Sequence, residues 1–421
     1  MSKKFSKISV IGLGYIGLPT AAMFASRKIE VVGVDVNEAA VDTINRGEIH
    51  IVEPDLDMVV HAAVHEGYLR ATTTPEPAEA FLIAVPTPFK GENHEPDLSY
   101  IEAAANMIAP VLEKGNLVIL ESTSPVGATE SMSGWLAAAR PDLSFPQEAG
   151  EDSDIRVAHC PERVLPGKVM HELVSNDRVI GGMTPRCSML AAALYKTFVT
   201  GVCVMASGPR VAEMAKLTEN SFRDVNIAFA NDLSMACDEL DIDVWEAISL
   251  ANRHPRVNIL QPGPGVGGHC IAVDPWFIIA SAPNNARLIR TAREVNDAKP
   301  GWVIDKIWNA IEAHLSDHAD RNAKNVSIAV YGLTFKPNID DLRESPALEI
   351  ARSLARDHEG SLLVVEPHIA ALPGGLEAAS LVTIEQASAV ADLHVMLVDH
   401  DAFKSAPAPD GRIIDTRGVW R

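Results

Sequence analysis

The stretch Ile8-Ser-Val-Ile-Gly-Leu-Gly-Tyr-Ile-Gly17 places three glycines directly after a short apolar run. The run predicts a buried strand, and the residues after Gly17 predict a helix that reaches about Arg27. A second strand is expected over residues 30–35, and it ends in Asp35, eighteen positions beyond the last glycine. A Gly-x-Gly-x-x-Gly between strand and helix, followed by such an acid, is typical of a dinucleotide-binding α/β unit.

The glycines and the acid suit NAD in particular. Gly12, Gly14 and Gly17 allow a tight turn and a close approach of a pyrophosphate to the helix N-terminus. Asp35 can accept hydrogen bonds from the adenosine ribose, and no arginine adjoins it to bind the 2′-phosphate of NADP. The alternative is a glycine turn with a purely structural role.

Further strands are expected over residues 81–85 and 117–120, each followed by a loop with a threonine. Ligands of an open parallel sheet lie beyond the carboxyl ends of its strands. Thr87 and Thr123 can therefore offer hydroxyls to a nicotinamide, although N-capping of the next helix explains them equally well. A strand over residues 155–158 leads to Cys160, which we interpret as a packing residue.

Composition excludes several classes of function. Of the 421 residues, 47% are hydrophobic and 22% charged, as in ordinary globular proteins of two or three domains. The net charge of −20 argues against nucleic-acid or anionic-membrane binding, so an anionic ligand needs a local basic pocket. The odd number of cysteines fits a reducing cytoplasm, and no apolar run reaches the roughly 20 residues of a membrane span. No metal site is expected, because His61 and His65 lack a third ligand.

A second glycine-rich stretch is Pro262-Gly-Pro-Gly-Val-Gly-Gly-His-Cys-Ile-Ala-Val-Asp-Pro275. Glycines let the backbone approach a ligand closely and take positive φ values. An isolated cysteine is ordinarily a small buried hydrophobe. Here the loop favours Cys270 as a nucleophile, since a packing cysteine needs no such run of glycines and prolines before it. Asp274 follows four residues later, near enough to serve the same site.

A long helix is expected over residues 210–240. Its apolar stripe includes Val211, Met214, Leu217 and Val225, and its polar stripe comprises Glu213, Lys216, Asn220 and Arg223. Lys216 and Asn220 lie about 6 Å apart along the helix axis, so both can serve one site. A solvated, salt-bridged face is the ordinary explanation of such a polar stripe.

The remaining chain predicts more helices and then a second α/β region. A short helix is expected over residues 244–253, the helical segment ends near Pro300, and a separate helix runs from about 302 to 315. Residues 316–325 are polar and form the best linker candidate. Strands are then expected over residues 326–330, 362–365, 393–398 and 412–414, with a helix over 346–356.

These patterns predict an α/β fold class with three domains. We expect an N-terminal Rossmann NAD domain at residues 1–205 and a central helical domain at 206–315. A C-terminal Rossmann-like α/β domain follows at 316–421.

An NAD site together with a nucleophilic cysteine indicates more than one oxidation. A thiol becomes useful once an alcohol has been oxidised to an aldehyde, because Cys270 can then form a thiohemiacetal. A further oxidation leaves a thioester, which water hydrolyses to a carboxylate. Lys216, Asn220 and Asp274 would form the polar set around the reacting carbon, the first two stabilising the oxyanion.

The chain resembles the UDP-glucose/GDP-mannose dehydrogenase family over essentially its full length. The matching motifs are Gly12-x-Gly14-x-x-Gly17, Ser122-Thr123-x-Pro125-x-Gly127, Pro161-Glu162-Arg163, Lys216-x-x-x-Asn220, Gly267-Gly-His-Cys270 with Asp274, and Phe335-Lys336-Pro337 with Asp341-x-Arg343-x-Ser345. Within the family, residues 252–276 are similar to the branch that oxidises UDP-N-acetyl-D-mannosamine. Ala272 stands where the wider family usually has proline, a departure that leaves thiol and acid in place.

The resemblance implies a four-electron oxidation of a UDP-sugar C6 alcohol to a uronic acid, with two NAD and water. It also implies a homodimer formed through the central helical domain, and a setting in cell-surface polysaccharide biosynthesis such as that of enterobacterial common antigen. Cys270 would be the nucleophile, Lys216 a proton donor/acceptor or oxyanion stabiliser, and Glu162 a group that orients water.

The resemblance also assigns binding residues by their positions in this sequence. Residues implied to contact NAD, besides the three glycines, are Tyr15, Ile16, Asp35, Thr87, Thr123 and Arg343. Residues implied to surround the nucleotide sugar are Arg163, Val164, Lys216, Asn220, Arg223, His254, Arg256, Gly267, Phe335 and Lys336. The basic members supply the local positive pocket that an anionic ligand requires.

Within the family, a 6-dehydrogenase acting on UDP-N-acetylglucosamine or UDP-glucose is the alternative to the manno sugar. Two rival functions outside the family remain. A two-electron hydroxyacid dehydrogenase also pairs an NAD domain with a helical domain carrying Lys-x-x-x-Asn, but it needs neither Cys270 nor a second α/β domain. The second rival is a noncatalytic NAD-sensing or scaffold protein. That function must treat Cys270, Lys216 and Asp274 as unrelated residues.

Overall fold

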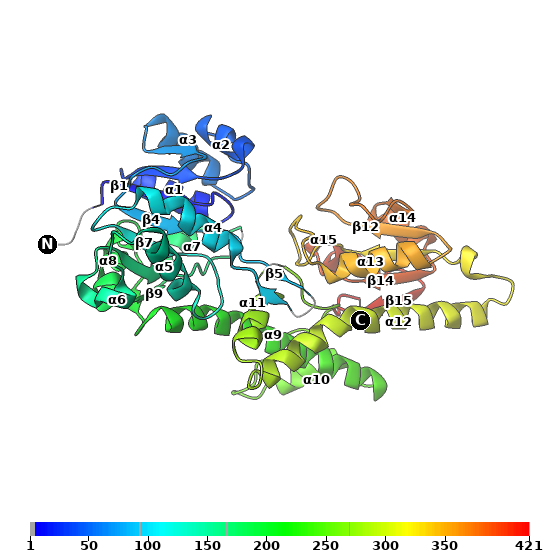
Figure 1. The fold of residues 1–421 in the computed structure, drawn as a ribbon. Helices are drawn as coiled ribbons and strands as arrows, with labels where there is room; N and C mark the ends of the chain where they lie inside the picture. Colours follow the sequence, from blue (N-terminus) through cyan, green and yellow to red (C-terminus); the bar gives the residue numbers. More distant parts are fainter. Residues whose placement is uncertain (1–4, 92–93, 166, 269, 421) are drawn as a thin grey trace. The chain divides into compact units, whose positions relative to one another are not determined.

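The computed structural model describes residues 5–91, 94–165, 167–268 and 270–420. It divides into two units, the first comprising residues 1–219 and 276–282 and the second residues 220–275 and 283–421 (Figure 1). The long helix α9 (Pro209–Glu239) and the shorter α11 (Asp274–Ser281) each contribute residues to both units.

The first unit is built on a sheet in the order β10-β9-β8-β7-β4-β1-β2-β3. All neighbours are parallel except β8 and β9, which pair antiparallel. Apart from the exposed Glu30, the cited central strands consist of buried residues that face helices on both sides, as is typical of parallel sheets. The strands are β1 (Lys7–Ile11), β2 (Glu30–Val34), β3 (Leu69–Thr72), β4 (Ala80–Ile83), β7 (Leu117–Leu120), β8 (Arg156–His159), β9 (Arg178–Gly182) and β10 (Cys203–Met205), with a separate hairpin of β5 (Phe89–Lys90) and β6 (Glu95–Pro96).

Helices cover both faces of this sheet with two separate hydrophobic cores. One face packs against α1 (Gly17–Ser26), α2 (Glu38–Asn45), α3 (Leu56–His65), α7 (Val169–Ser175) and α8 (Pro185–Tyr195). The other packs against α4 (Ser99–Ile108) and α5 (Ala128–Ala139), with the short α6 (Pro146–Ala149) nearby in sequence. This is the doubly wound arrangement expected for the N-terminal domain.

The second unit contains a parallel sheet in the order β13-β12-β11-β14-β15. Its strands are β11 (Ile328–Tyr331), β12 (Leu362–Val365), β13 (Ala379–Leu381), β14 (Leu393–Met396) and β15 (Arg412–Asp415). Helices α12 (Arg287–Asp317) and α13 (Pro346–Asp357) pack on one face, and α14 (Ile384–Val390) and α15 (Asp401–Lys404) on the other. The expected second α/β region is therefore present.

The expected break at Pro300 is wrong, because α12 continues through it (Figure 1). A proline inside a helix cannot donate to the carbonyl four residues earlier, here that of Asn296. The backbone of Gly265 lies against this carbonyl, since a Cβ on Gly265 would stand 3.2 Å from the oxygen. Packing against the Gly265 loop thus accompanies a proline that, from its helix propensity alone, would be expected to end the helix.

The expected faces of α9 are also corrected. Val211 and Met214 are exposed, whereas Glu213 and Asn220 are buried. The solvated-face explanation of the polar stripe therefore fails for these two residues. Buried polar groups require hydrogen-bond partners, and both residues have them, as described below.

Candidate active site

The first βα turn is shaped by glycines that larger residues cannot replace. Gly12 has φ +89°, and a Cβ there would lie 2.6 Å from the Ala84 carbonyl oxygen. A Cβ on Gly17 would lie 1.8 Å from the Gly12 carbonyl oxygen, whereas nothing lies within 4 Å of one on Gly14. The turn is thus packed tightly at two glycines and open at the third.

The dinucleotide edge fits NAD. No side chain caps the N-terminus of α1, which leaves backbone amides for a pyrophosphate. The Asp35 carboxylate accepts hydrogen bonds from the backbone N–H of Leu13 at 2.8 Å and of Asn37 at 2.9 Å. These bonds fix the carboxylate at the end of β2, where a ribose would meet it. Beside the turn, Tyr15 is exposed and Ile16 half-buried.

The two threonines beyond β4 and β7 do not cap helices. The N-cap of α4 is Leu98 and that of α5 is Gly127, so the capping explanation of Thr87 and Thr123 is wrong. The Thr87 hydroxyl oxygen is buried and has no hydrogen-bond partner among the described residues. A buried hydroxyl at the carboxyl edge of the sheet is suited to a bound ligand.

A buried charged cluster follows β7 and β8. Arg178 Nη1 lies 2.5 Å from Glu162 Oε2 and 3.8 Å from Glu121 Oε1, and the Tyr195 hydroxyl donates to Glu121 at 2.9 Å. Burial raises the pKa of Glu121 to about 7 and that of the Cys160 thiol to about 12. The protonated Cys160 agrees with its interpretation as a packing residue. Sequence reasoning found Glu162 but missed its partner Arg178 on β9 and the neighbouring Glu121–Tyr195 pair.

Glu213 of the α9 polar stripe has a structural role within the first unit. Its carboxylate accepts hydrogen bonds from the backbone N–H of Gly127 and Thr129 and from the Thr129 hydroxyl, at 2.6–2.8 Å. It therefore holds the turn that leads into α5.

Three other predicted residues belong to this unit. Lys216, one turn after Glu213, is half-buried. Arg163 forms an ion pair with Glu219 at 2.6 Å, and Val164 packs at the edge of the sheet core.

Cys270 lies just before α11 in the second unit, and it is exposed. Its backbone carbonyl accepts hydrogen bonds from the N–H groups of Val273 at 3.2 Å and Asp274 at 2.9 Å. Asp274 is buried and begins α11, and the Asn220 side-chain amide donates to its carboxylate at 2.5 Å. The predicted Asn220 and Asp274 are thus brought together beside the thiol-bearing turn.

Glycines of this loop accept close packing from the C-terminal α/β region. A Cβ on Gly267 would lie 2.2 Å from the Glu344 carbonyl oxygen, and one on Gly268 would lie 2.9 Å from the Phe335 ring. Gly268, with φ +83°, donates its N–H to the Arg343 carbonyl at 3.2 Å. Predicted Gly267 and Phe335 are therefore neighbours. His269 lies outside the described residues.

The remaining predicted residues of the second unit differ in their surroundings. Lys336 is half-buried beside Phe335, and the Arg343 guanidinium pairs with Asp341. Arg223, His254 and Arg256 are exposed side chains of the helical segment.

A pocket in the second unit adjoins the glycine loop. Its lining includes Gly265, Phe335, Lys336, Pro346 and Arg417. Sequence reasoning missed Arg417, which donates to the Pro262 carbonyl at 3.2 Å and pairs with Asp399. Asp399 also lines this pocket and is the ion-pair partner of Arg417, so Lys336 is the candidate cation for an anionic nucleotide.

The second sheet repeats part of the first nucleotide turn. Gly332 follows β11 with φ +91°, and Leu333 donates its N–H to the Glu366 carboxylate at 2.8 Å after β12. Gly12, Leu13 and Asp35 have the same relation in the first sheet. Both units therefore contain a glycine turn and an acid arranged as in nucleotide-binding sheets.

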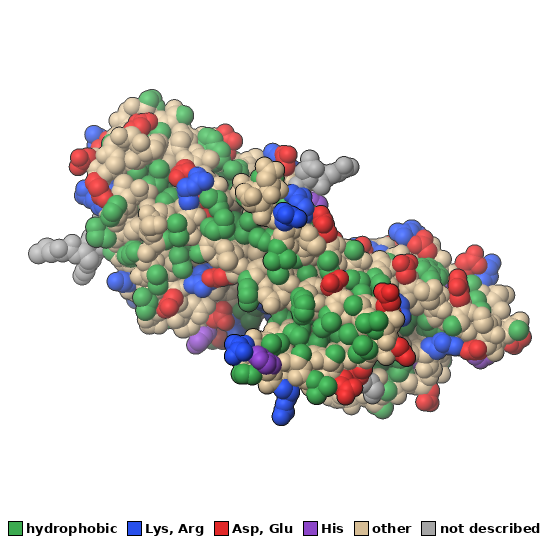
Figure 2. Space-filling model, turned by 90° about the horizontal axis from the view of Figure 1, so that it is seen from below, with side chains coloured by type: hydrophobic (Ala, Val, Ile, Leu, Met, Phe, Trp, Pro, Cys, Tyr) green, Lys and Arg blue, Asp and Glu red, His purple; other side chains and the backbone are tan. Residues whose placement is uncertain are grey.

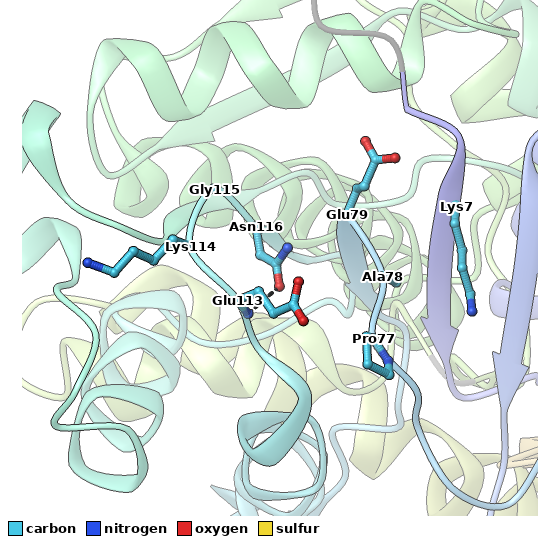
Figure 3. Close-up of a pocket in the computed structure, with 8 residues that line it drawn as sticks. All are labelled: Lys7, Pro77, Ala78, Glu79, Glu113, Lys114, Gly115 and Asn116. Carbon is cyan, nitrogen blue, oxygen red and sulfur yellow. Dashed lines mark hydrogen bonds between the residues drawn. The ribbon is translucent and has the colours of Figure 1, made fainter.

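A wider pocket of about 410 Å³ lies at the opposite edge of the first sheet (Figure 3). Lys7 begins β1, Glu79 precedes β4 and Asn116 precedes β7, so this pocket surrounds the amino ends of the strands. Ligands of parallel sheets bind at the carboxyl ends. This pocket is therefore separate from the dinucleotide edge.

Three consecutive parts of the chain match the UDP-glucose/GDP-mannose dehydrogenase family. Residues 6–199 match its NAD binding domain, residues 210–298 its central domain and residues 329–421 its UDP binding domain. In the part of the chain that the structure describes, no helix is long and apolar enough to cross a membrane.

Individual proteins of known name are similar over almost the whole chain. UDP-N-acetyl-D-mannosamine dehydrogenase of Salmonella typhi is 66% identical over 421 residues, which cover 99% of this chain and 100% of that protein. NDP-N-acetyl-D-galactosaminuronic acid dehydrogenase of Ralstonia nicotianae is 65% identical over 419 residues, which cover 99% and 96%.

Solved structures are similar over the same length. UDP-D-ManNAc dehydrogenase of Pyrococcus horikoshii superposes with a TM-score of 0.85 at 38% identity, covering 99% of this chain and 96% of that one. UDP-N-acetyl-mannosamine dehydrogenase Cap5O of Staphylococcus aureus superposes with a TM-score of 0.83 at 40% identity, with the same coverage.

Proposed function

The chain belongs to the UDP-glucose/GDP-mannose dehydrogenase family, and from this membership we propose that it oxidises UDP-N-acetyl-D-mannosamine at C6 to UDP-N-acetyl-D-mannosaminuronate. NAD is the cofactor of the family's N-terminal domain. The observation that carries the proposal is an exposed Cys270 on a glycine loop, followed by the buried Asn220–Asp274 pair. Relatives at 66% and 64% identity that are named UDP-N-acetyl-D-mannosamine dehydrogenase support the sugar.

The chemistry assigns a separate task to each residue. When bound, NAD accepts the hydride that leaves the sugar carbon in each of two oxidations. After the first, the Cys270 thiolate forms a bond to the aldehyde carbon, and the carbonyl oxygen gains negative charge before it takes up a proton. Lys216 and Asn220 stabilise that oxygen, and Asp274 fixes the Asn220 amide in a donating orientation.

The second oxidation converts the thiohemiacetal to a thioester. Water then adds to the thioester carbon, the carbon–sulfur bond breaks, and the Cys270 thiol is released with a carboxylate product. Glu162 is the group that orients this water, held by Arg178 at 2.5 Å and by the backbone N–H of Arg163 at 2.7 Å. The active protein divides into an NAD domain at residues 1–205, a catalytic helical domain at 206–315 and a UDP-sugar domain at 316–421.

A homodimer formed through the helical segment belongs to this proposal. Phe222, Phe229, Leu240, Leu250 and Leu288 expose 56–69% of their surface, and Figure 2 shows hydrophobic side chains gathered over these helices. Exposed apolar patches rimmed by polar residues mark interaction sites. Phe222→Asp is expected to shift sedimentation from dimer to monomer, whereas Val390→Asp on an exposed site of α14 leaves it unchanged. A dimeric Phe222→Asp contradicts this interface.

A second candidate substrate is an N-acetyl-D-galactosamine nucleotide, because the relative from Ralstonia nicotianae is 65% identical. The test compares initial rates of NAD reduction with the UDP derivatives of N-acetyl-D-mannosamine, N-acetyl-D-galactosamine and N-acetyl-D-glucosamine. We expect turnover with the manno sugar at least tenfold above the others, which corresponds to about 1.4 kcal/mol. Faster turnover of either other sugar refutes the assignment while leaving the reaction type.

A further inference from the structure

A chain of buried hydrogen bonds connects two helices to the loop that carries Cys270. Arg293 Nη1 of α12 donates to Asp224 Oδ1 of α9 at 2.6 Å. The Asn296 side-chain amide donates to the same oxygen at 2.8 Å, and the Asn231 amide donates to Asn296 Oδ1 at 2.9 Å. Asn231 Oδ1 in turn accepts the backbone N–H of Gly263 at 2.8 Å. The four residues that contribute side chains are at most 1% exposed.

Only one orientation of the two asparagine amides satisfies every hydrogen bond in this chain. A carboxylate can only accept, so Asp224 forces Asn296 to turn its NH₂ toward α9 and its oxygen toward Asn231. Asn231 must then turn its own NH₂ toward Asn296, which leaves its oxygen facing the Gly263 N–H. The Asp224 carboxylate and the Asp224 backbone carbonyl both accept from the Asn296 amide, and together they set the orientation of two amides and present an acceptor to the loop.

The loop is fixed at this point from more than one side. The Pro262 carbonyl, adjacent to Gly263, accepts from Arg417. Two residues after Gly263, a Cβ on Gly265 would lie 3.0 Å from Pro346 and 3.2 Å from the Asn296 carbonyl oxygen. Asn296 thus orients the Asn231 amide through its side chain and meets the loop through its backbone. Cys270 follows seven positions after Gly263.

We propose that Asp224, Asn296 and Asn231 form a directional relay that positions the Cys270 loop, and that they are positioning residues for the thiol chemistry. The relay itself rests only on the contacts above. Its consequence for catalysis rests on the proposed function. Neither composition nor spacing in the sequence distinguishes these residues from ordinary helix-surface asparagines and aspartates.

The test cuts the relay at its two amides. Asn231→Leu removes the acceptor of the Gly263 N–H. Asn296→Leu keeps that acceptor but removes the oxygen that fixes its orientation. The double variant Asn231→Leu/Asn296→Leu shows whether the two amides act in series, because a relay already cut at Asn231 has nothing further to lose at Asn296. Asn226→Asp is the matched control, since that amide donates to Phe222 on the same helix.

The primary readout is hydrogen exchange of residues 261–268, followed by mass spectrometry without any substrate. Each single variant is expected to raise exchange about 5-fold to 150-fold, the effect of one unsatisfied buried partner. The double variant is expected to exchange within about threefold of Asn231→Leu, and the control to leave exchange unchanged. Singles that exchange normally, or a double whose increase is the product of the two single increases, overturn the relay.

Folding and activity complete the test. If a leucine variant does not fold, the alanine variant at the same position takes its place, with the same expected outcomes. Alkylation of Cys270 by iodoacetamide and uronate formation are then measured in the same proteins. If a variant shows faster hydrogen exchange in the loop but an unchanged kcat, the proposed positioning role is wrong. An unmodified protein with a protected loop and no uronate contradicts the proposed function alone.

Discussion

Replacing Asn220 by aspartate converts the Asn220–Asp274 bond into a pair of carboxylates. The donor and acceptor atoms are 2.5 Å apart and both residues are buried. Two unit charges at that distance repel by about 7 kcal/mol at an effective dielectric constant of about 20, before the side chains relax. Such a pair keeps one shared proton, so the pKa of the variant's dyad is strongly raised.

The shared proton gives Asn220→Asp a distinctive pH profile. At low pH the proton replaces the missing N–H between the two oxygens, and much of the local geometry survives. As pH rises through the raised pKa, the pair ionises and both kcat and the free energy of unfolding fall. Asn220→Ala, in contrast, loses a hydrogen bond to a charged group, about 1.5–3 kcal/mol or roughly 10-fold to 150-fold in kcat, without that profile.

The assay is kcat from pH 5.5 to 9, with urea unfolding at the same pH values. Asn226→Asp, on the same helix, serves as the control and should follow the unmodified protein. If Asn220→Asp and the unmodified protein show parallel profiles in both measurements, the two side chains are not coupled as described. A loss of activity that is equal at all pH values likewise refutes the reasoning.

Three further predictions concern separate parts of the molecule. Cys270→Ser should abolish uronate formation while NAD binding, measured by calorimetry, stays within about twofold; uronate formation at the unmodified rate would rule out the thioester. Asp35→Ala should raise the KM for NAD about tenfold, through loss of ribose hydrogen bonds, with a smaller effect on kcat; an unchanged KM contradicts the assigned site. Burial lowers the pKa of Lys299 to about 7, so the unfolded state binds more protons between pH 7 and about 10, and the free energy of unfolding should rise with pH there. Lys299→Met should flatten that rise in urea unfolding, and an unaltered slope would show that Lys299 is not its source.

The first nucleotide turn was predictable because it depends on residues close in sequence. Gly12 and Gly17 tolerate no Cβ where they stand, and Asp35 ends the next strand, so local spacing carries the whole signal. The same holds for the central strands of both sheets, whose apolar runs match the described elements, whereas β3, β9, β10 and β13 were not predicted. The Cys270 loop was recognisable from its run of glycines and prolines, although the residues that these glycines contact, such as Glu344 and Arg417, are distant in the sequence.

Features that depend on tertiary contacts were harder to predict from the sequence. Pro300 predicts a helix end, yet the helix passes through it where Gly265 approaches the Asn296 carbonyl. On α9, helical spacing identified a polar stripe but could not show that Glu213 and Asn220 are buried with partners from distant segments. Arg178 was missed because its partner Glu162 lies on a different segment of the chain.

The most direct test of the account is the molar yield of NADH from a limiting amount of UDP-N-acetyl-D-mannosamine. We expect two NADH per sugar and one carboxylate product, because the proposed Cys270 thioester requires a second oxidation. One NADH per sugar, with an aldehyde or ketone as the end product, would contradict it.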